Sequence, residues 1–149
     1  MKMRFIYYFV KKEGLNEIAI TDGDTIDAII DQGRGILGLA KIRIEAVDSP
    51  ESSIAEQAAA AAVAKKVLAH WLAKHDLKTL RIVSNSLDKY GRILGDVEVV
   101  DKEGITTEKC SEFLLAFGCV RLYHGEAKLP WIREELAKIE SLAALAEAI

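Results

Sequence analysis

Polar and apolar residues alternate in several short stretches of the chain, and this pattern predicts β-strands. The first stretch, residues 5–10, is rich in aromatic and β-branched side chains, which favour strands. Two apolar runs flank a Gly-Arg-Gly turn signal at 33–35, so residues 22–51 are predicted to fold back as a hairpin. The strand patterns lie at residues 5–10, with a continuation at 15–20, and at residues 26–30, 36–47, 77–83 and 93–100.

The second arm of this hairpin alternates regularly over residues 41–46. In a half-buried strand, every second side chain points to the same face of the sheet. Ile42, Ile44 and Ala46 are therefore predicted to face the core. Arg43 is predicted to face outward, where a ligand would meet it.

An alanine-rich stretch that extends to about residue 75 predicts a long helix, because alanine has the highest helix propensity. Its start, residues 53–56, has the Ser-x-x-Glu spacing of a capping box, in which two side chains bond the first backbone N–H groups. Val63, Val67 and Trp71 lie four residues apart and are predicted to form its buried stripe.

Shorter patterns predict two further helices towards the C-terminus. Residues 84–92 are polar and predict a turn, and residues 107–117 predict a helix that stops at Gly118. Pro130 suits the first turn of a last helix, with Trp131 as its anchor. The predicted packing stripe of this last helix consists of Ile132, Leu136, Ile139 and Ala143.

Five strands interrupted by a helix fit an α+β fold, a five-stranded OB-fold β-barrel with about three helices. Composition alone does not choose this barrel over other α+β arrangements. The 149 residues are half hydrophobic, which predicts one globular domain spanning residues 1–149 with a sizeable core.

The charge and the cysteine count restrict the function only weakly. A net charge of −3 does not indicate nucleic-acid binding, although a local basic groove with a bound cation can still hold phosphate. Cys110 and Cys119 are too few for a disulfide framework or a metal motif, and both are interpreted as ordinary thiols. A monomer is the default expectation.

No export signal or membrane span is predicted. The apolar run at 5–10 is too short to cross a membrane, and it lacks a small-residue cleavage site. The chain as written is therefore predicted to be cytoplasmic, or secreted or periplasmic if a signal had been removed from it.

The predicted hairpin brings two acidic clusters to one end of the sheet. Asp22 and Asp24 precede the first arm, and Asp48 and Glu51 follow the second. Carboxylates suit a hard cation such as Ca²⁺ or Mg²⁺, and Arg43 nearby suggests a metal-assisted site for a phosphate. Each cluster alone has a plainer explanation, because Asp-Gly is a common turn and Ser-Pro-Glu a common helix start.

Four motifs in a fixed order make a stronger case together than any one of them does. They are Asp-Gly-Asp-Thr at 22–25, Ile-Arg-Ile at 42–44, Val-Asp-Ser-Pro-Glu at 47–51 and Asp-Lys-Tyr-Gly-Arg at 88–92. Over residues 18–123 this series resembles the staphylococcal nuclease (thermonuclease) family. The resemblance implies the OB-fold barrel and a Ca²⁺-dependent hydrolysis of phosphodiester bonds in DNA and RNA that leaves 3′-phosphates.

The resemblance also implies a role for individual residues. Calcium would be held by Asp24, Asp48 and the backbone carbonyl of Ser49, with Asp22 supporting them. The catalytic residues would be Arg43 and Arg92, which bind phosphate, and Glu51, the general base. Substrate contacts would come from Lys89 and Tyr90, on a terminal phosphate, and from Tyr123.

The residue chemistry agrees with these roles. Hydrolysis of an anionic phosphodiester needs charge neutralisation, an activated water and stabilisation of the extra charge in the transition state. Arg43 and Arg92 supply planar forks that match phosphate oxygens, and Glu51 can deprotonate a water. The segment after Glu51 is short, which predicts a more open site than that of a family member with a long, lysine-containing loop there.

Two other hypotheses remain beside the nuclease. One is a non-catalytic OB-fold module that binds nucleic acid or a protein, against which the intact set of Arg43, Glu51 and Arg92 argues. The other is a metal-binding structural domain whose acidic motifs only form turns. This hypothesis leaves Arg43 and Arg92 unexplained.

Overall fold

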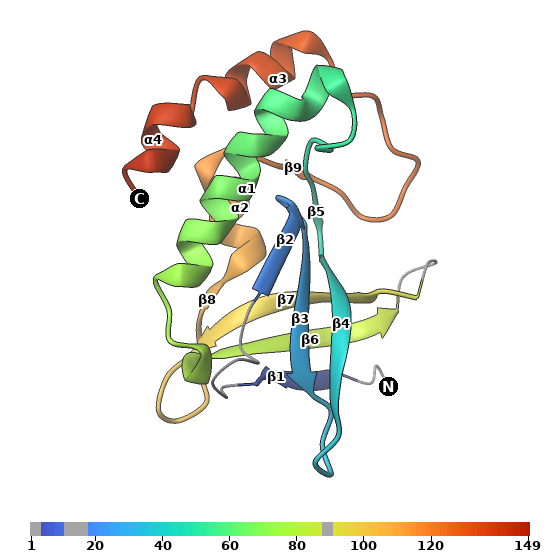
Figure 1. The fold of residues 1–149 in the computed structure, drawn as a ribbon, viewed down its shortest axis with the longest axis vertical. Helices are drawn as coiled ribbons and strands as arrows, with labels where there is room; N and C mark the ends of the chain where they lie inside the picture. Colours follow the sequence, from blue (N-terminus) through green and yellow to red (C-terminus); the bar gives the residue numbers. More distant parts are fainter. Residues whose placement is uncertain (1–3, 11–17, 88–90) are drawn as a thin grey trace.

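A closed β-barrel forms the body of the protein. The computed structural model describes residues 4–10, 18–87 and 91–149. The barrel strands close in the order β1-β6-β7-β4-β3, with β3 pairing back to β1 (Figure 1). All neighbours are antiparallel except β4 and β7, which are parallel. The five strands are β1 (Phe5–Phe9), β3 (Thr25–Asp31), β4 (Leu37–Ile44), β6 (Leu80–Leu87) and β7 (Ile93–Val100).

The remaining elements extend or cover this barrel. Strand β2 (Ile18–Asp22) pairs with β3, β8 (Thr106–Lys109) pairs with β7, and the short β5 (Val47–Asp48) and β9 (Arg121–Leu122) pair with each other. The helices are α1 (Ala58–Ala73), α2 (Cys110–Phe117), α3 (Arg133–Glu140) and α4 (Ala143–Glu147). The predicted α+β fold, a five-stranded OB-fold barrel with helices, is thus confirmed.

The predicted hairpin is formed by β3 and β4. Its turn places Gly33, Arg34 and Gly35 at positive φ, which glycine adopts without strain. Thr25 lies opposite Arg43 at the other end of the hairpin, and Ile44 N–H donates to the Asp24 carbonyl at 2.7 Å. The hairpin therefore returns the second acidic cluster to the first.

The main core lies between the barrel and α1. Val63, Val67 and Trp71 are buried, as their spacing predicts. In Figure 1, α3 and α4 lie along α1 on the side away from the strands. No described helix is long and apolar enough to cross a membrane.

The start of α1 differs from the predicted capping box. Residues 55–57 form a 3-10 turn, and neither the N-cap of this turn nor that of α1 makes a side-chain hydrogen bond. The neighbouring polar groups are used to fix the acidic segment instead. Ser52 bonds to Asp22, and the Gln57 side chain accepts from the Glu51 N–H at 2.8 Å.

Three other boundaries were predicted wrongly, one because Asp76 caps a turn and two because strand pairing overrides local polarity. Residues 77–79 form a 3-10 turn rather than strand. The first residues of the predicted turn at 84–92 belong to a strand instead, since β6 continues to Leu87 and pairs with β7. The predicted helix at 107–117 begins at Cys110, because residues 106–109 pair with β7 as β8.

The last helices also differ in detail. Gly118 ends α2 at a φ of 92°, as predicted. Pro130 precedes α3 rather than lying in its first turn, and the Glu135 side chain accepts from the Ile132 N–H where the helix begins. Leu136 and Ile139 are buried, whereas Ile132 and Ala143 of the predicted stripe are exposed; the last described buried residue here is Ala146.

Both cysteines are buried and free. Burial raises the pKa of the Cys119 thiol to about 12. The Cys110 thiol, which is fully covered, also has a raised pKa. A thiol held protonated is a poor nucleophile, which agrees with the interpretation of both as ordinary thiols.

Candidate functional site

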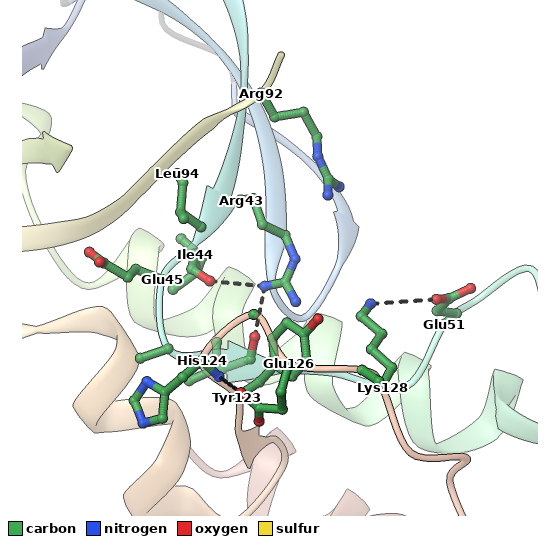
Figure 2. A pocket seen from close by; sticks show the side chains of 14 residues that line it. Arg43, Ile44, Glu45, Glu51, Arg92, Leu94, Tyr123, His124, Glu126 and Lys128 are labelled. Carbon is green, nitrogen blue, oxygen red and sulfur yellow. Dashed lines mark hydrogen bonds and ion pairs between the residues drawn. The ribbon is translucent and has the colours of Figure 1, made fainter. Parts of the chain in front are cut away.

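A cleft of about 990 Å³ opens beside the end of the β3–β4 hairpin. Its walls come from the end of β4, the residues before and within β7, and the loop between β9 and α3. Arg43, Glu51 and Arg92 all line it. Figure 2 shows the two arginines directed towards the cleft, Arg43 from β4 and Arg92 from the position before β7, with the loop carrying Tyr123 and Lys128 opposite them. Residues far apart in the sequence are therefore gathered at one opening.

Arg43 is fixed in place by two nearby backbone carbonyls and by two carboxylates. Its Nη1 donates to the carbonyls of Ile44 at 2.9 Å and Val47 at 2.8 Å. Its Nη2 lies 3.2 Å from Asp24 Oδ2 and 3.7 Å from Asp48 Oδ1. The prediction that Arg43 faces outward is wrong in one respect. The residue is only 6% exposed, because the chain turns back after β4 and covers it.

The turn after β4 also corrects the prediction for Ala46. This residue has a φ of 68° and is half-buried. It lies in the turn after β4 and does not continue the series of core-facing residues. Ile42 and Ile44 are fully buried, as predicted. The positive φ of Ala46 changes the direction of the chain, so that Val47 and Asp48 pair with β9. The turn thereby brings the Val47 carbonyl and the Asp48 carboxylate to Arg43.

Asp24 is buried at the base of the site. One carboxylate oxygen accepts from the Thr25 hydroxyl at 2.8 Å, and the other accepts from the Ser49 N–H at 2.8 Å. Burial raises the pKa of Asp24, and the Asp48 charge acts in the same direction. The Arg43 guanidinium and the two hydrogen bonds oppose this shift. Two carboxylates held this close favour a cation between them.

Asp48 has three cationic partners. Arg121 Nε and Nη2 lie 3.1 and 2.9 Å from Oδ2, while Lys128 Nζ lies 3.3 Å from Oδ1. Arg43 is the third. The Arg121 guanidinium also stacks on Trp131, 3.9 Å from the ring centroid. The predicted anchoring role of Trp131 thus extends to the site itself.

Sequence reasoning missed Arg121 and Lys128. Arg121 meets Asp48 because β9 pairs with β5 in that register, and Lys128 arrives on the loop that follows. Neither residue belongs to a motif, and both are more than 70 positions from Asp48. No local pattern identifies such a contact.

Glu51 lies at the rim of the cleft. Its side chain is 44% exposed, and its Oε1 is 3.9 Å from Lys128 Nζ (Figure 2). Asp22 points elsewhere, since its Oδ1 accepts from the N–H of Ser52 at 2.8 Å and from its hydroxyl at 2.6 Å. The structure therefore brings Asp24 and Asp48 together, keeps Glu51 near them, and uses Asp22 to hold the connecting turn.

The predicted substrate contacts are only partly described. Lys89 and Tyr90 lie outside the described residues, whereas Arg92 just beyond them lines the cleft. Tyr123 also lines it, fixed by a hydrogen bond from its N–H to the Ala46 carbonyl at 2.9 Å. Its ring lies 5.7 Å from Lys128 Nζ.

The donor chemistry of this site suits a hard cation only in part. Among residues 4–10, 18–87 and 91–149, no group of three or more His, Cys, Asp or Glu side chains is arranged to hold a metal. Asp24 and Asp48 form a buried pair of carboxylates, and the carbonyl of Ser49 would add a neutral oxygen. Ca²⁺ accepts such oxygens and completes its shell with water. The residues therefore fit an incomplete site with open positions.

A family model described as "Staphylococcal nuclease homologue" matches residues 41–147, which is most of the chain. A search of curated proteins found none that matches.

Proposed function

We propose that this chain, which belongs to the family of staphylococcal nuclease homologues, is a calcium-dependent nuclease acting on DNA and RNA. Family membership and the OB-type barrel support a nuclease-family or nucleic-acid-binding role. The proposal adds hydrolysis of phosphodiester bonds, a requirement for Ca²⁺ and products with 3′-phosphates.

The observation that carries the proposal is the presence of Arg43, Arg92 and Glu51 in one cleft. A binding groove for phosphate needs cations but no carboxylate at its rim. A carboxylate beside two guanidinium groups suits a reaction in which water must be deprotonated next to an anion. The cleft also has room for a nucleotide, since pockets for small ligands are typically about 300–1,000 Å³.

Arg43 would stabilise the charge that develops on the phosphate. Its Nη1 is held by two backbone carbonyls, so the guanidinium keeps its orientation without being ordered by substrate. Such preorganised charge acts at no further reorganisation cost when the transition state forms. Arg92, on the other wall, would contact the same phosphate from a second direction.

Glu51 would bind and deprotonate the attacking water. Its side chain is partly exposed, so water reaches it, and its backbone is fixed by Gln57. A general base contributes about 10²–10⁴-fold to a rate. Tyr123, together with Lys89 and Tyr90, would bind the nucleotide that flanks the cleaved bond.

Asp24, Asp48 and the Ser49 carbonyl would hold the Ca²⁺ ion. When bound, Ca²⁺ would neutralise phosphate charge and orient the water and the substrate. The Ser49 N–H and the Thr25 hydroxyl keep the Asp24 carboxylate oriented. Arg121 does the same for Asp48.

A non-catalytic module that binds nucleic acid or protein is the second candidate. One observation favours it: Asp48 is already neutralised by cationic side chains, so the barrel does not need a metal to balance this buried charge. Such a module would bind through Arg43, Arg92 and Lys128 without turnover.

Cleavage assays on the purified protein separate the two candidates. Single- and double-stranded DNA and RNA are incubated with Ca²⁺ or with excess chelator, and the product ends are mapped. The nuclease predicts cleavage only with Ca²⁺, 3′-phosphate ends and a steep loss in Glu51→Gln. An absence of cleavage by the wild type with Ca²⁺ would favour the binding module. Full activity in chelator would remove calcium from the mechanism.

A further inference from the structure

The loop between β9 and α3 places an ammonium group beside Asp48, a proposed metal ligand, and near Glu51, the proposed base. Lys128 Nζ lies 3.3 Å from Asp48 Oδ1 and 3.9 Å from Glu51 Oε1 (Figure 2). Asp48 is 2% exposed at its side chain, whereas Lys128 is 45% exposed. A partly exposed cation therefore pairs with a buried anion.

We propose that Lys128 is a tethered counterion, a side chain whose ammonium group competes with a divalent cation for the Asp48 carboxylate. This inference rests on the proposed function, because it concerns the same site. It adds a determinant of metal affinity that lies 80 residues after Asp48 in the sequence.

The position of the ammonium group favours competition over simple support. A divalent ion bound to Asp48 Oδ1 would lie beside Lys128 Nζ, and the two cations would repel each other. Arg43 Nη2 also lies 3.7 Å from this oxygen, but Arg43 Nη1 is held by two backbone carbonyls, so Lys128 is the cation that can leave. The metal therefore binds only to molecules in which Lys128 has left. Affinity falls in proportion to the fraction of such molecules.

Arg121 is held beside Asp48 by more contacts than Lys128 is. It contacts the other oxygen of Asp48 with two nitrogens, stacks on Trp131 and donates to the Leu129 carbonyl. These contacts fix the guanidinium, so it stays while a metal binds. Lys128 has a flexible stem and no described partner other than the two carboxylates and a ring.

The ring of Tyr123 lies beside the same ammonium group. Lys128 Nζ lies 5.7 Å from the ring centroid, which is within the range of a cation–π contact. Because this ring lines the cleft, it would keep a favourable contact with the ammonium when a metal takes Asp48.

The test is calorimetric titration with Ca²⁺ alone of the wild type and two variants. Lys128→Met keeps the apolar stem and removes the charge. Lys41→Met is the matched control, because Lys41 has nearly the same exposure, 44%, and pairs with Asp27 rather than with a site carboxylate. At a salt concentration of about 0.15 M, exposed charges beyond about 8 Å are largely screened.

Lys128→Met is expected to bind Ca²⁺ roughly three- to tenfold more tightly than the wild type, since the competing ion pair is partly exposed. Lys41→Met is expected to change affinity less than about twofold. Equal or weaker binding by Lys128→Met overturns the proposal. So does an equal gain in Lys41→Met, because that result reports net charge alone.

Chemical labelling of the wild type gives an independent readout. An amine-acylating reagent is applied with and without Ca²⁺, and the labelled peptides are quantified by mass spectrometry. Ca²⁺ is expected to increase labelling at Lys128 and to leave Lys41 unchanged, because a released amine is more nucleophilic than an ion-paired one. Unchanged or decreased labelling of Lys128 contradicts the displacement.

The cleavage assay separates failure of this inference from failure of the proposed function. Calcium-dependent cleavage by the wild type, with no gain in affinity in Lys128→Met, overturns the tethered counterion alone. A gain in affinity without any cleavage supports the counterion and overturns the nuclease. An absence of Ca²⁺ binding in all three proteins overturns both.

Discussion

Arg121 holds Asp48 with two guanidinium nitrogens on a single carboxylate oxygen, at 3.1 and 2.9 Å. The pair connects β9 to β5 across their short ladder, in which the two residues lie opposite each other. Through its stack on Trp131 and a contact of 3.8 Å with Glu135, Arg121 also connects the site to the start of α3. A residue outside every sequence motif thus positions a proposed metal ligand.

Replacing Arg121 with Met is expected to lower the free energy of unfolding by about 1–3 kcal/mol, because Asp48 stays buried with fewer partners. Urea unfolding measures this loss. Arg133→Met is the control, since Arg133 makes an exposed pair with Glu140 in the same region, and it is expected to cost no more than about 1 kcal/mol. Equal effects of the two changes would show that Arg121 does not support Asp48.

Arg121→Met also tests whether Arg121 positions the metal ligand. Calcium affinity is expected to fall, because Asp48 Oδ2 loses the contacts that orient the carboxylate. Arg121→Lys, which keeps the charge, is expected to recover part of the affinity. A merely structural role would change stability while leaving the calcium dissociation constant of the folded variant intact.

Glu51→Gln is expected to reduce turnover by about 10²–10⁴-fold while nucleotide binding survives or improves. The substitution keeps the size and hydrogen bonding of the side chain but removes the base and one negative charge. Single-turnover cleavage and nucleotide binding are measured side by side with the wild type. Equal cleavage by the two proteins would exclude Glu51 as the base.

Arg43→Lys and Arg92→Lys are both expected to reduce turnover, since an ammonium lacks the bidentate fork. Arg43→Lys is also expected to reduce the free energy of unfolding by about 1–3 kcal/mol. The reason is that one ammonium cannot replace the donors to Ile44, Val47 and Asp24. Thermal unfolding checks this; an unchanged stability of Arg43→Lys would show that these buried contacts are energetically minor.

Asp96→Asn tests a pH dependence outside the site. Burial raises the pKa of Asp96 above its ordinary value of 3.8, against opposing hydrogen bonds from Ser111. The folded protein then binds this proton more tightly than the unfolded chain, so stability falls as the pH rises from 3.8 through the raised pKa.

The asparagine variant removes this titration, so its unfolding free energy should decline less between about pH 4 and pH 8. Some decline is expected to remain, because burial also raises the pKa of Asp24. Urea unfolding across this range compares the two proteins. A decline as steep as that of the wild type would show that Asp96 does not titrate in this range.

Binding of duplex DNA is expected to depend only modestly on salt. Among the residues that the structure describes, three cationic side chains line the cleft, Arg43, Arg92 and Lys128, and each neutralised phosphate contributes a slope of about −0.9. The slope of log K against log salt, measured with Glu51→Gln at constant Ca²⁺, should therefore be no steeper than about −3. A slope implying on the order of ten phosphate contacts would reveal another basic surface.

Patterns between residues close in the sequence were sufficient to predict several elements of the fold. The two arms of the β3–β4 hairpin follow from alternation around a Gly-rich turn, and the buried stripe Val63, Val67 and Trp71 follows from helical spacing. The motifs also singled out Arg43, Glu51 and Arg92, which line one cleft. These predictions succeed because side-chain periodicity and turn chemistry act between residues close in sequence.

Tertiary structure alone decided the electrostatics of the site. Arg43 occupies an outward position in the alternating pattern of its strand. The turn at Ala46, which has a positive φ, nevertheless folds the following segment over it. Arg121 and Lys128 meet Asp48 only because β5 and β9 pair in one register, 73 residues apart. Whether a charge is buried, and which ions surround it, depends on contacts between distant segments. No local pattern encodes them, because the partners lie far apart in the sequence and meet only through strand pairing.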